Sequence, residues 1–176
     1  MDWYVVDKKY VLYLTQFDSR VGYVEYGDRI KLHIGIVLEI HDKQYYVPVS
    51  SPKVKHYQMA NSLDFLRIED KTKASLYAVL NLNNMIPVPK ECISKLRYNE
   101  IQKYRAFKSE KERSDYIYLL QNEKLIIDRM ADTIKKKAER LYKSVIEKPY
   151  SRLAQRCCNF KSLEDALDKY MECGDS

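Results

Sequence analysis

The chain has 176 residues and a formal charge of +6, with 31 lysines and arginines against 25 aspartates and glutamates. Its length suits one hydrophobic core, so we expect residues 1–176 to form a single domain. No apolar run approaches the ~20 residues needed to cross a bilayer, and an acidic residue follows the first methionine where a secretion signal would be basic. The sequence therefore predicts a cytoplasmic protein that makes no membrane contact.

The cysteines and histidines do not form a metal-binding pattern. The four cysteines lack the paired spacing of zinc sites, and no two of the three histidines share a face with a carboxylate. With only four glycines, the chain also has no glycine-rich loop for a nucleotide. We therefore expect no metal ion and no cofactor, and we interpret the cysteines as ordinary reduced thiols.

Tyrosine is the unusual residue of this composition, with sixteen copies against four phenylalanines and one tryptophan. A tyrosine ring stacks on RNA bases and its hydroxyl reaches phosphate, so a basic, tyrosine-rich chain favours an RNA partner. The charge of +6 is weak evidence by itself, because many proteins carry it. We expect most of the tyrosines at the edge of the core and a few on a ligand.

The first 95 residues are predicted to be rich in strands. Trp3–Val6 forms an opening strand, and Asp7 caps a short helix that ends at Phe17. From residue 30 to residue 40 a large aliphatic side chain occupies every second position, which is the pattern of a strand with one buried face. Further strands are expected at Phe65–Ile68 and Ser75–Leu82.

A hairpin follows directly from this alternating strand. After a polar break at residues 41–44, Tyr45–Val49 resumes a β-branched and aromatic run. The run ends at Ser50-Ser51-Pro52-Lys53, because proline cannot donate a ladder hydrogen bond. In an antiparallel hairpin the start of the first strand lies beside the end of the second. Lys31 should therefore lie next to Ser50 and Ser51, where cations and hydroxyls make a candidate anion site.

The second part of the chain, residues 100–176, is predicted to be helical. Ser109 and Glu112 form a capping box, and apolar residues at helical spacing continue from there to Val145. A helix over residues 109–148 is too long for a globular domain, so we expect a break within it and an end near Pro149. Lysines and Arg140 crowd the solvent side of its second half. A last helix is predicted over residues 162–174.

The candidate chemistry is the cleavage of a phosphodiester. RNA carries its own nucleophile, the 2′-hydroxyl, so a protein need only deprotonate it and stabilise the pentacoordinate phosphate with fixed cations and donors. Lys31, Ser50, Ser51 and Lys53 supply such groups. Lys31 could equally be a solvated strand residue, and the serines before proline could be a plain turn. The combination at adjacent strand ends favours the functional interpretation.

Five ordered blocks give the chain a family resemblance over nearly its whole length. It resembles the ToxN/AbiQ family, the endoribonuclease toxins of type III toxin–antitoxin systems. The blocks are Tyr4–Tyr10 with Phe17–Val21, then Lys31–Ile40, Pro48–Lys53 with His56 beyond it, Asn81–Pro87, and Cys158–Glu164.

The resemblance implies an α+β fold, with a twisted antiparallel β-sheet or partial barrel flanked by helices and similar to the Kid/MazF class of RNases. It also implies a toxin that a small repeat RNA, folded as pseudoknots, holds inactive and that cuts this RNA from its precursor. Target mRNA, a role in phage abortive infection and a cyclic toxin–RNA assembly are further implications.

Carried over residue by residue, the resemblance places Lys31 and the Ser50-Ser51 pair at the family's active-site positions, with Lys53 and Tyr10 beside them. The family usually has Thr-Ser at this pair, a change that keeps both hydroxyls. His33 and Lys55 stand where relatives have aromatic residues, which affects base preference near the cut.

We therefore predict a metal-independent endoribonuclease that leaves a 2′,3′-cyclic phosphate and a 5′-hydroxyl. Lys31 and Ser51 stabilise the transition state, and Ser50 and Lys53 position the phosphate. The general base stays open among three residues: Tyr10, His33 and His56. Further RNA contacts are expected from four residues: Lys55, Tyr26, Lys136 and Arg140. The alternative is a non-catalytic protein that binds structured RNA with the same side chains.

Overall fold

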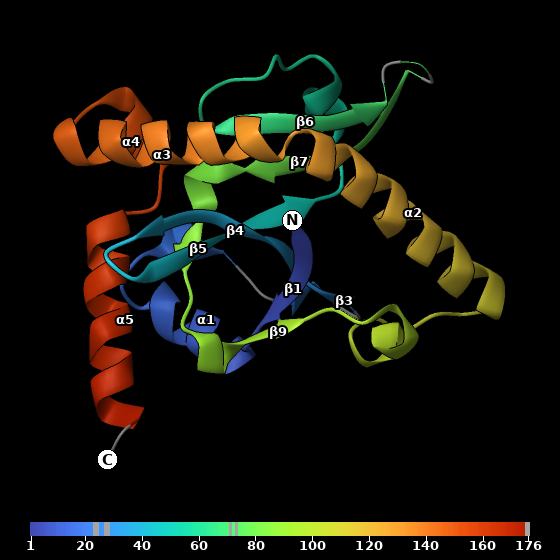
Figure 1. Cartoon of the computed structure of the whole chain (residues 1–176), viewed down its shortest axis with the longest axis horizontal. Coiled ribbons are helices and arrows are strands. Elements are labelled where there is room, and N and C mark those ends of the chain that lie inside the picture. Colours follow the sequence, from blue (N-terminus) through green and yellow to red (C-terminus); the bar gives the residue numbers. More distant parts are fainter. Residues whose placement is uncertain (23–24, 27–28, 71, 73, 175–176) are drawn as a thin grey trace.

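The computed structural model describes residues 1–22, 25–26, 29–70, 72 and 74–174, with only the backbone at 25, 26, 29 and 174. Within this described part, no helix is both long and apolar enough to span a membrane. The chain folds into one large antiparallel sheet with helices packed around it, so the predicted α+β class is confirmed (Figure 1).

Seven strands form the main sheet, in the order β6-β7-β5-β4-β1-β9 with β8 paired to β5. All of its neighbouring strands run antiparallel, and among the described residues the sheet stays open with β6 and β9 at its edges. A separate short pair consists of β2 and β3. The strands are β1 Asp2–Val6, β2 Glu25–Tyr26, β3 Arg29–Ile30, β4 Leu32–Ile40, β5 Lys43–Ser50, β6 Phe65–Asp70, β7 Ser75–Asn81, β8 Ile86–Pro87 and β9 Ile93–Lys95.

Helices pack around the sheet. Figure 1 shows α2 and α3 as one long helical path with a bend, and α5 as a separate column beside the sheet. α3 packs against β4, α2 against β6 and β7, and α5 against β8 and α1. The helices are α1 Lys8–Thr15, α2 Glu110–Arg129, α3 Ala131–Glu147, α4 Arg152–Arg156 and α5 Phe160–Gly174. Short 3₁₀ turns are η1 Ser19–Val21, η2 Val54–Tyr57, η3 Leu82–Asn84, η4 Lys90–Cys92 and η5 Tyr98–Lys103.

The predicted hairpin is formed by β4 and β5, and its turn is tighter than expected. Only His41 and Asp42 lie outside the strands, and both have positive φ (47° and 62°), as two-residue hairpin turns require. Lys43 and Gln44, predicted to belong to the break, pair with Ile40 and Glu39 instead. This turn fixes the register only beside it, because carried on to the far end of the hairpin it would set His33 opposite Ser50.

The strict alternation predicted for β4 fails at His33, which is buried, and at Ile36 and Val37, whereas Leu38 is buried and Glu39 exposed as predicted. Ile34 pairs with Val47 and Leu38 with Tyr45, so β4 uses four residues where β5 uses two, and a bulge moves Val37 into the core in place of Ile36. The segment before the bulge is buried on both faces, His33 included. A Cβ at Gly35 would collide with the Tyr46 ring, so this close approach needs glycine.

The helical half follows the prediction with two corrections. The expected break falls at Met130, between α2 and α3, and Ser109 caps α2 by accepting from the Glu112 backbone N–H. The last helix begins at Phe160 rather than residue 162, because the Asn159 side chain accepts from the N–H of Ser162 and caps it there. The short helix α4 was not predicted.

A buried carboxylate connects the helical half to the sheet. Tyr45 of β5 and Tyr142 of α3 both donate to Glu164 Oε1, at 2.8 and 2.7 Å, and Lys161 lies 3.0 Å from Oε2. Burial alone would raise the pKa of Glu164, but hydrogen bonds from these three side chains hold it below its ordinary value. The ionised form therefore stabilises the folded chain.

Replacing Glu164 with glutamine should lower the free energy of unfolding by ~1–3 kcal/mol at pH 7, because a charged acceptor is lost. The lowered folded-state pKa means that this contribution is complete above the unfolded pKa of ~4.3 and is lost as the pH falls. Urea unfolding at pH 7 and pH 4 measures both effects. The matched variant Glu139→Gln, at an exposed pair with Lys143, should change stability by under ~0.5 kcal/mol. Equal losses in both variants would contradict the account.

Candidate active site

Lys31 and Ser50 lie together as the hairpin predicts. Lys31 sits between β3 and β4, Ser50 ends β5, and Lys31 Nζ donates to Ser50 Oγ at 2.6 Å. Asn81, at the end of β7, donates its amide N–H to the same oxygen at 3.3 Å. Two donors thus occupy the lone pairs of the Ser50 hydroxyl, and its hydrogen is left to donate to a ligand.

The Lys31 ammonium is held where a charge is poorly solvated. Burial, with a smaller contribution from the positive charge of Lys53, lowers the pKa of Lys31 to about 8. At neutral pH most of these side chains remain protonated, and roughly one in ten carries the neutral amine. An entering phosphate group would favour the charged form, so the position suits an anion.

Ser51 and Lys53 complete the cluster from the loop after β5. Both are exposed, and both line one cavity together with Lys31 and Ser50. His56 holds this loop in place, because its Nδ1 accepts from the Lys53 backbone N–H at 3.0 Å and its ring contacts Phe65. The structure therefore brings together Lys31, Ser50, Ser51 and Lys53 as the sequence predicts.

Two cavities meet at this cluster, and Lys31 and Ser50 line both of them. The first cavity, about 350 Å³, lies on the side of α2 and is walled by Tyr116, Leu119, Leu120 and Glu123. The second cavity, about 140 Å³, lies on the side of α1 and is lined by Arg20, His33, Asn81 and Asn84. A chain molecule with its phosphate on Lys31 and Ser50 would thus have room on either side.

Two predicted site residues are corrected by burial. Tyr10 has no exposed surface, its hydroxyl donates to the Pro87 carbonyl at 2.8 Å, and burial raises its pKa. It can neither contact RNA nor act as a base. His56 is also buried, burial lowers its pKa, and its Nδ1 accepts from the loop backbone, which leaves it poorly placed to act as a base.

His33 is placed differently from expectation, since it is only 4% exposed instead of lying on the polar face of β4. Burial, and then the charge of Lys31, lower its pKa to about 3, so the ring is neutral at physiological pH. It still lines the second cavity, and in the described part of the chain its Nδ1 has no hydrogen-bond partner. An RNA contact by His33 stays a prediction, whereas a role as general base is not supported.

The other predicted RNA contacts are not gathered at the cluster. Lys55 is exposed on η2, beside Lys53, and the Tyr26 side chain lies outside the described residues. Lys136 and Arg140 are exposed on α3, where Lys136 lines a third cavity of about 450 Å³ against the 36–40 end of β4. This third cavity shares no lining residue with the other two.

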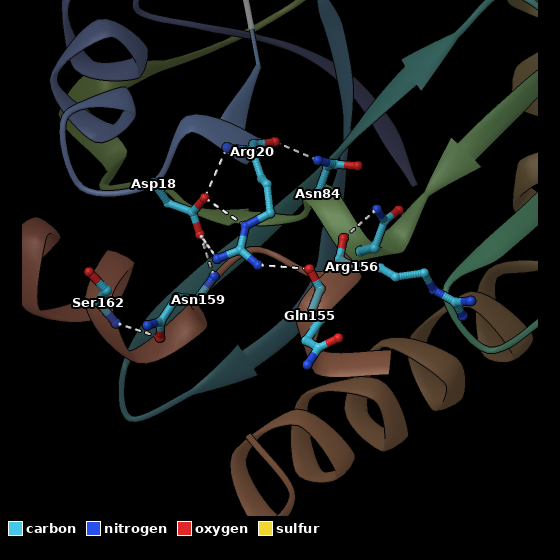
Figure 2. A network of polar contacts seen from close by, with 8 residues as sticks. Asp18, Arg20, Asn84, Gln155, Arg156, Asn159 and Ser162 are labelled. Carbon is cyan, nitrogen blue, oxygen red and sulfur yellow. Dashed lines mark hydrogen bonds and ion pairs between the residues drawn. The ribbon is translucent and has the colours of Figure 1, made fainter. Parts of the chain in front are cut away.

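Several residues that the fold brings to the cavities are not among those predicted from the sequence. Arg20 is clamped by Asp18 through Nε (2.9 Å) and Nη2 (3.0 Å), and it donates to the Gln155 carbonyl at 3.0 Å. Figure 2 shows this network, in which Asn84 also donates to the Arg20 carbonyl. Arg20 and Asn81 stand inside blocks that carry the resemblance, so a signal existed for them.

Arg105 and Glu123 of the first cavity had no such signal. The Arg105 guanidinium pairs with Glu112 at 3.1 Å and lies over the Tyr116 ring, 4.3 Å from its centroid. Glu123 is buried on the inner face of α2. Each is a single charged residue far along the chain from Lys31. As for metal ligands, no group of three or more histidine, cysteine, aspartate or glutamate side chains gathers among the described residues.

Comparison with known proteins shows relatives that match the chain over nearly its whole length. The endoribonuclease ToxN of Pectobacterium atrosepticum is 29% identical to the chain, over 99% of the chain and 94% of the relative. One solved structure, described as "A processed non-coding RNA regulates a bacterial antiviral system", matches with a TM-score of 0.79 and 27% identity, over 96% of this chain and 98% of its own. A second solved structure has the same TM-score and 25% identity, over 97% of this chain and 98% of its own. It is described by "selective toxin inhibition by a non-coding RNA pseudoknot".

A sequence model of the family described as "Toxin ToxN, type III toxin-antitoxin system" matches residues 2–168. This match takes in the whole sheet, the cluster at Lys31 and most of the last helix. The chain therefore belongs to the ToxN family of type III toxin–antitoxin systems.

Proposed function

We propose that the protein is an endoribonuclease toxin whose active centre is the Lys31–Ser50–Ser51 cluster, and that a structured non-coding RNA holds it inactive. The observation that carries this proposal is the hydrogen bond from Lys31 to Ser50 at the point where two cavities meet. Family membership supports the activity, since a relative is named an endoribonuclease. The RNA partner is supported by the related structure described by toxin inhibition through an RNA pseudoknot.

The reaction is a transesterification within the RNA. The 2′-oxygen attacks the adjacent phosphorus, the bond to the 5′-oxygen breaks, and the products are a 2′,3′-cyclic phosphate and a 5′-hydroxyl. The 2′-proton passes to a base of the protein, and the departing 5′-oxygen takes a proton from water. Because the nucleophile belongs to the substrate, the protein supplies proton transfer and charge stabilisation and no metal ion is required.

Lys31 is the residue best placed to take the 2′-proton. Tyr10 and His56 are buried and engaged elsewhere, and the pKa of His33 is about 3. A lysine with a pKa of about 8 has enough neutral amine near pH 7 to accept a proton. Once protonated, the same group is an ammonium beside the developing phosphorane. Lys31 thus acts first as base and then as stabilising cation.

The hydroxyls and Lys53 hold the phosphate. The Ser50 hydrogen is free to donate because Lys31 and Asn81 both donate to its oxygen. Ser51, exposed on the same cavity, donates to a non-bridging oxygen of the transition state, and Lys53 adds a second positive charge. Fixed donors of this kind contribute most where charge develops during the reaction.

Lys31→Arg should slow cleavage of a short RNA by at least ~100-fold, because a guanidinium keeps the charge but cannot accept a proton. Ser51→Ala removes a hydrogen-bond donor to the phosphate oxygens and should slow cleavage by ~100-fold or more. Single-turnover rates at subsaturating RNA between pH 6 and pH 9 measure both and report the free protein, so the wild-type rate should rise with pH and level off near pH 8, the pKa of Lys31.

The control for this series is Lys90→Arg, at an exposed lysine on η4 away from the cluster, and it should cleave at the wild-type rate. Full activity of Lys31→Arg would show that Lys31 supplies charge alone. Tight RNA binding without cleavage by the wild type would show that the protein binds RNA and is not an endoribonuclease.

A second RNA surface lies on α3. Lys136 and Arg140 are exposed there, and Lys136 lines the third cavity together with Lys135 and Lys143. This surface is separate from the active cavities, so one toxin can contact two RNA segments at once. If each protein binds one RNA at each of its two surfaces, protein and RNA molecules can follow one another around a closed ring. We therefore propose that this surface binds the antitoxin RNA and contributes to a cyclic assembly.

The double variant Lys136→Gln/Arg140→Gln should weaken binding of the antitoxin RNA and lower the slope of log affinity against log salt by ~1–2, because two phosphate contacts are removed. Cleavage of a short oligonucleotide should be unchanged. Fluorescence anisotropy at several salt concentrations measures the slope. Lys90→Gln/Lys169→Gln removes the same charge from exposed positions elsewhere. An equal effect of this control would assign the loss to net charge alone.

A further inference from the structure

Glu123 is a buried carboxyl group without a partner. It is 5% exposed on the inner face of α2, and it lines the first cavity with Lys31, Ser50 and Ser51. Among the described residues, none forms a hydrogen bond or ion pair with it. Its carboxyl oxygens are not among the fully buried unpaired atoms, so a ligand in the first cavity can reach them.

The cations around this cavity do not neutralise Glu123. The titratable groups that share the cavity with it are Lys31, Lys53, Arg105 and Tyr116, and β7 contributes only an alanine. Lys31 donates to Ser50, and Arg105 pairs with Glu112 and stacks over aromatic rings. Lys53 is exposed on its loop. Glu123 is therefore not part of a salt bridge that would explain its burial.

An unpaired carboxyl in such surroundings keeps its proton at neutral pH, because the charged form is poorly solvated. Burial raises the pKa of Glu123 to about 8. A protonated carboxyl has a donor O–H and an acceptor C=O side by side. It also leaves the phosphate of a bound RNA without a nearby negative charge to repel it.

The walls of the first cavity suit the flat face of a base. Leu32 and Val49 come from the sheet, and Tyr116, Leu119 and Leu120 come from α2. An apolar cavity with a few converging polar groups is the usual form of a site for a small ring. With a phosphate on Lys31 and Ser50, the neighbouring nucleotide can place its base against these walls and toward Glu123.

We propose that Glu123 is a specificity-determining residue, whose neutral carboxyl hydrogen-bonds the Watson–Crick edge of one RNA base inserted into the first cavity. Each base has a donor and an acceptor next to each other on that edge, so the orientation imposed by the cavity decides which base is accepted. The ionised carboxylate would accept two hydrogen bonds instead, and only guanine offers two adjacent donors. The inference rests on the proposed RNA cleavage at Lys31.

The test uses RNA oligonucleotides with a single cut, in which all four bases are placed in turn at each of the two positions that flank it. At one position the wild type should prefer its best base over its worst by ~10- to 100-fold in kcat/KM, the range for one bidentate base contact. Glu123→Gln keeps a donor and an acceptor and should retain this preference. Glu123→Leu keeps the volume and should reduce it to under about threefold.

The pH dependence separates the carboxyl from other groups. Between pH 6.5 and pH 9 the rate with guanine, relative to the other bases, should rise in the wild type as Glu123 ionises and stay constant in Glu123→Gln. Titration of Lys31 changes the rates of all substrates together and cancels in this ratio.

The outcomes are distinguishable. A wild type that cuts none of the oligonucleotides contradicts the proposed function itself. Suppose that the wild type cuts and that Glu123→Leu, shown by its thermal unfolding transition to be folded, keeps the full base preference. This result overturns this inference alone. A Glu123→Leu variant that loses kcat equally on all bases would make Glu123 a proton-transfer group, which also overturns it.

Discussion

The hydrogen bond from Lys31 to Ser50 is the contact on which the site depends. The two-residue turn at His41–Asp42 sets the register of β4 with β5 beside it, and the bulge between Ile34 and Leu38 shifts that register by two residues, which brings Lys31 rather than His33 opposite Ser50. A slip of one residue in this register would turn every side chain of one strand to the opposite face. The hairpin therefore determines both the position of the lysine and the direction of the serine hydroxyl.

The helices give this contact its chemical properties. α2 closes the first cavity and α1 borders the second, so the Lys31 ammonium is partly removed from water and its pKa falls to about 8. The Glu164 cluster joins α3 and α5 to the central strand β5, which holds this arrangement together. The helical half of the chain thus lines the proposed active centre as well as supporting it.

The sequence predicted the hairpin and the meeting of Lys31 with Ser50, because both follow from a period of two and from a proline that ends a strand. It did not predict the burial of Tyr10 and His56, since burial of an amphipathic side chain is decided by what packs on it from elsewhere. Nor did it predict Arg105 and Glu123, which reach the cavity from more than 70 residues beyond Lys31 with no local pattern. The bulge in β4 likewise arises from pairing and not from composition.

The most direct test of the account is whether the RNA supplies its own nucleophile. Purified protein, free of antitoxin RNA, would be incubated in EDTA with an RNA that is cut once and with the same RNA carrying a single 2′-deoxy nucleotide just 5′ of the cut. We expect 2′,3′-cyclic phosphate and 5′-hydroxyl ends by mass spectrometry for the first RNA, and no cut at that position in the second. Cleavage of the deoxy substrate, or products with 5′-phosphate ends, would contradict this expectation.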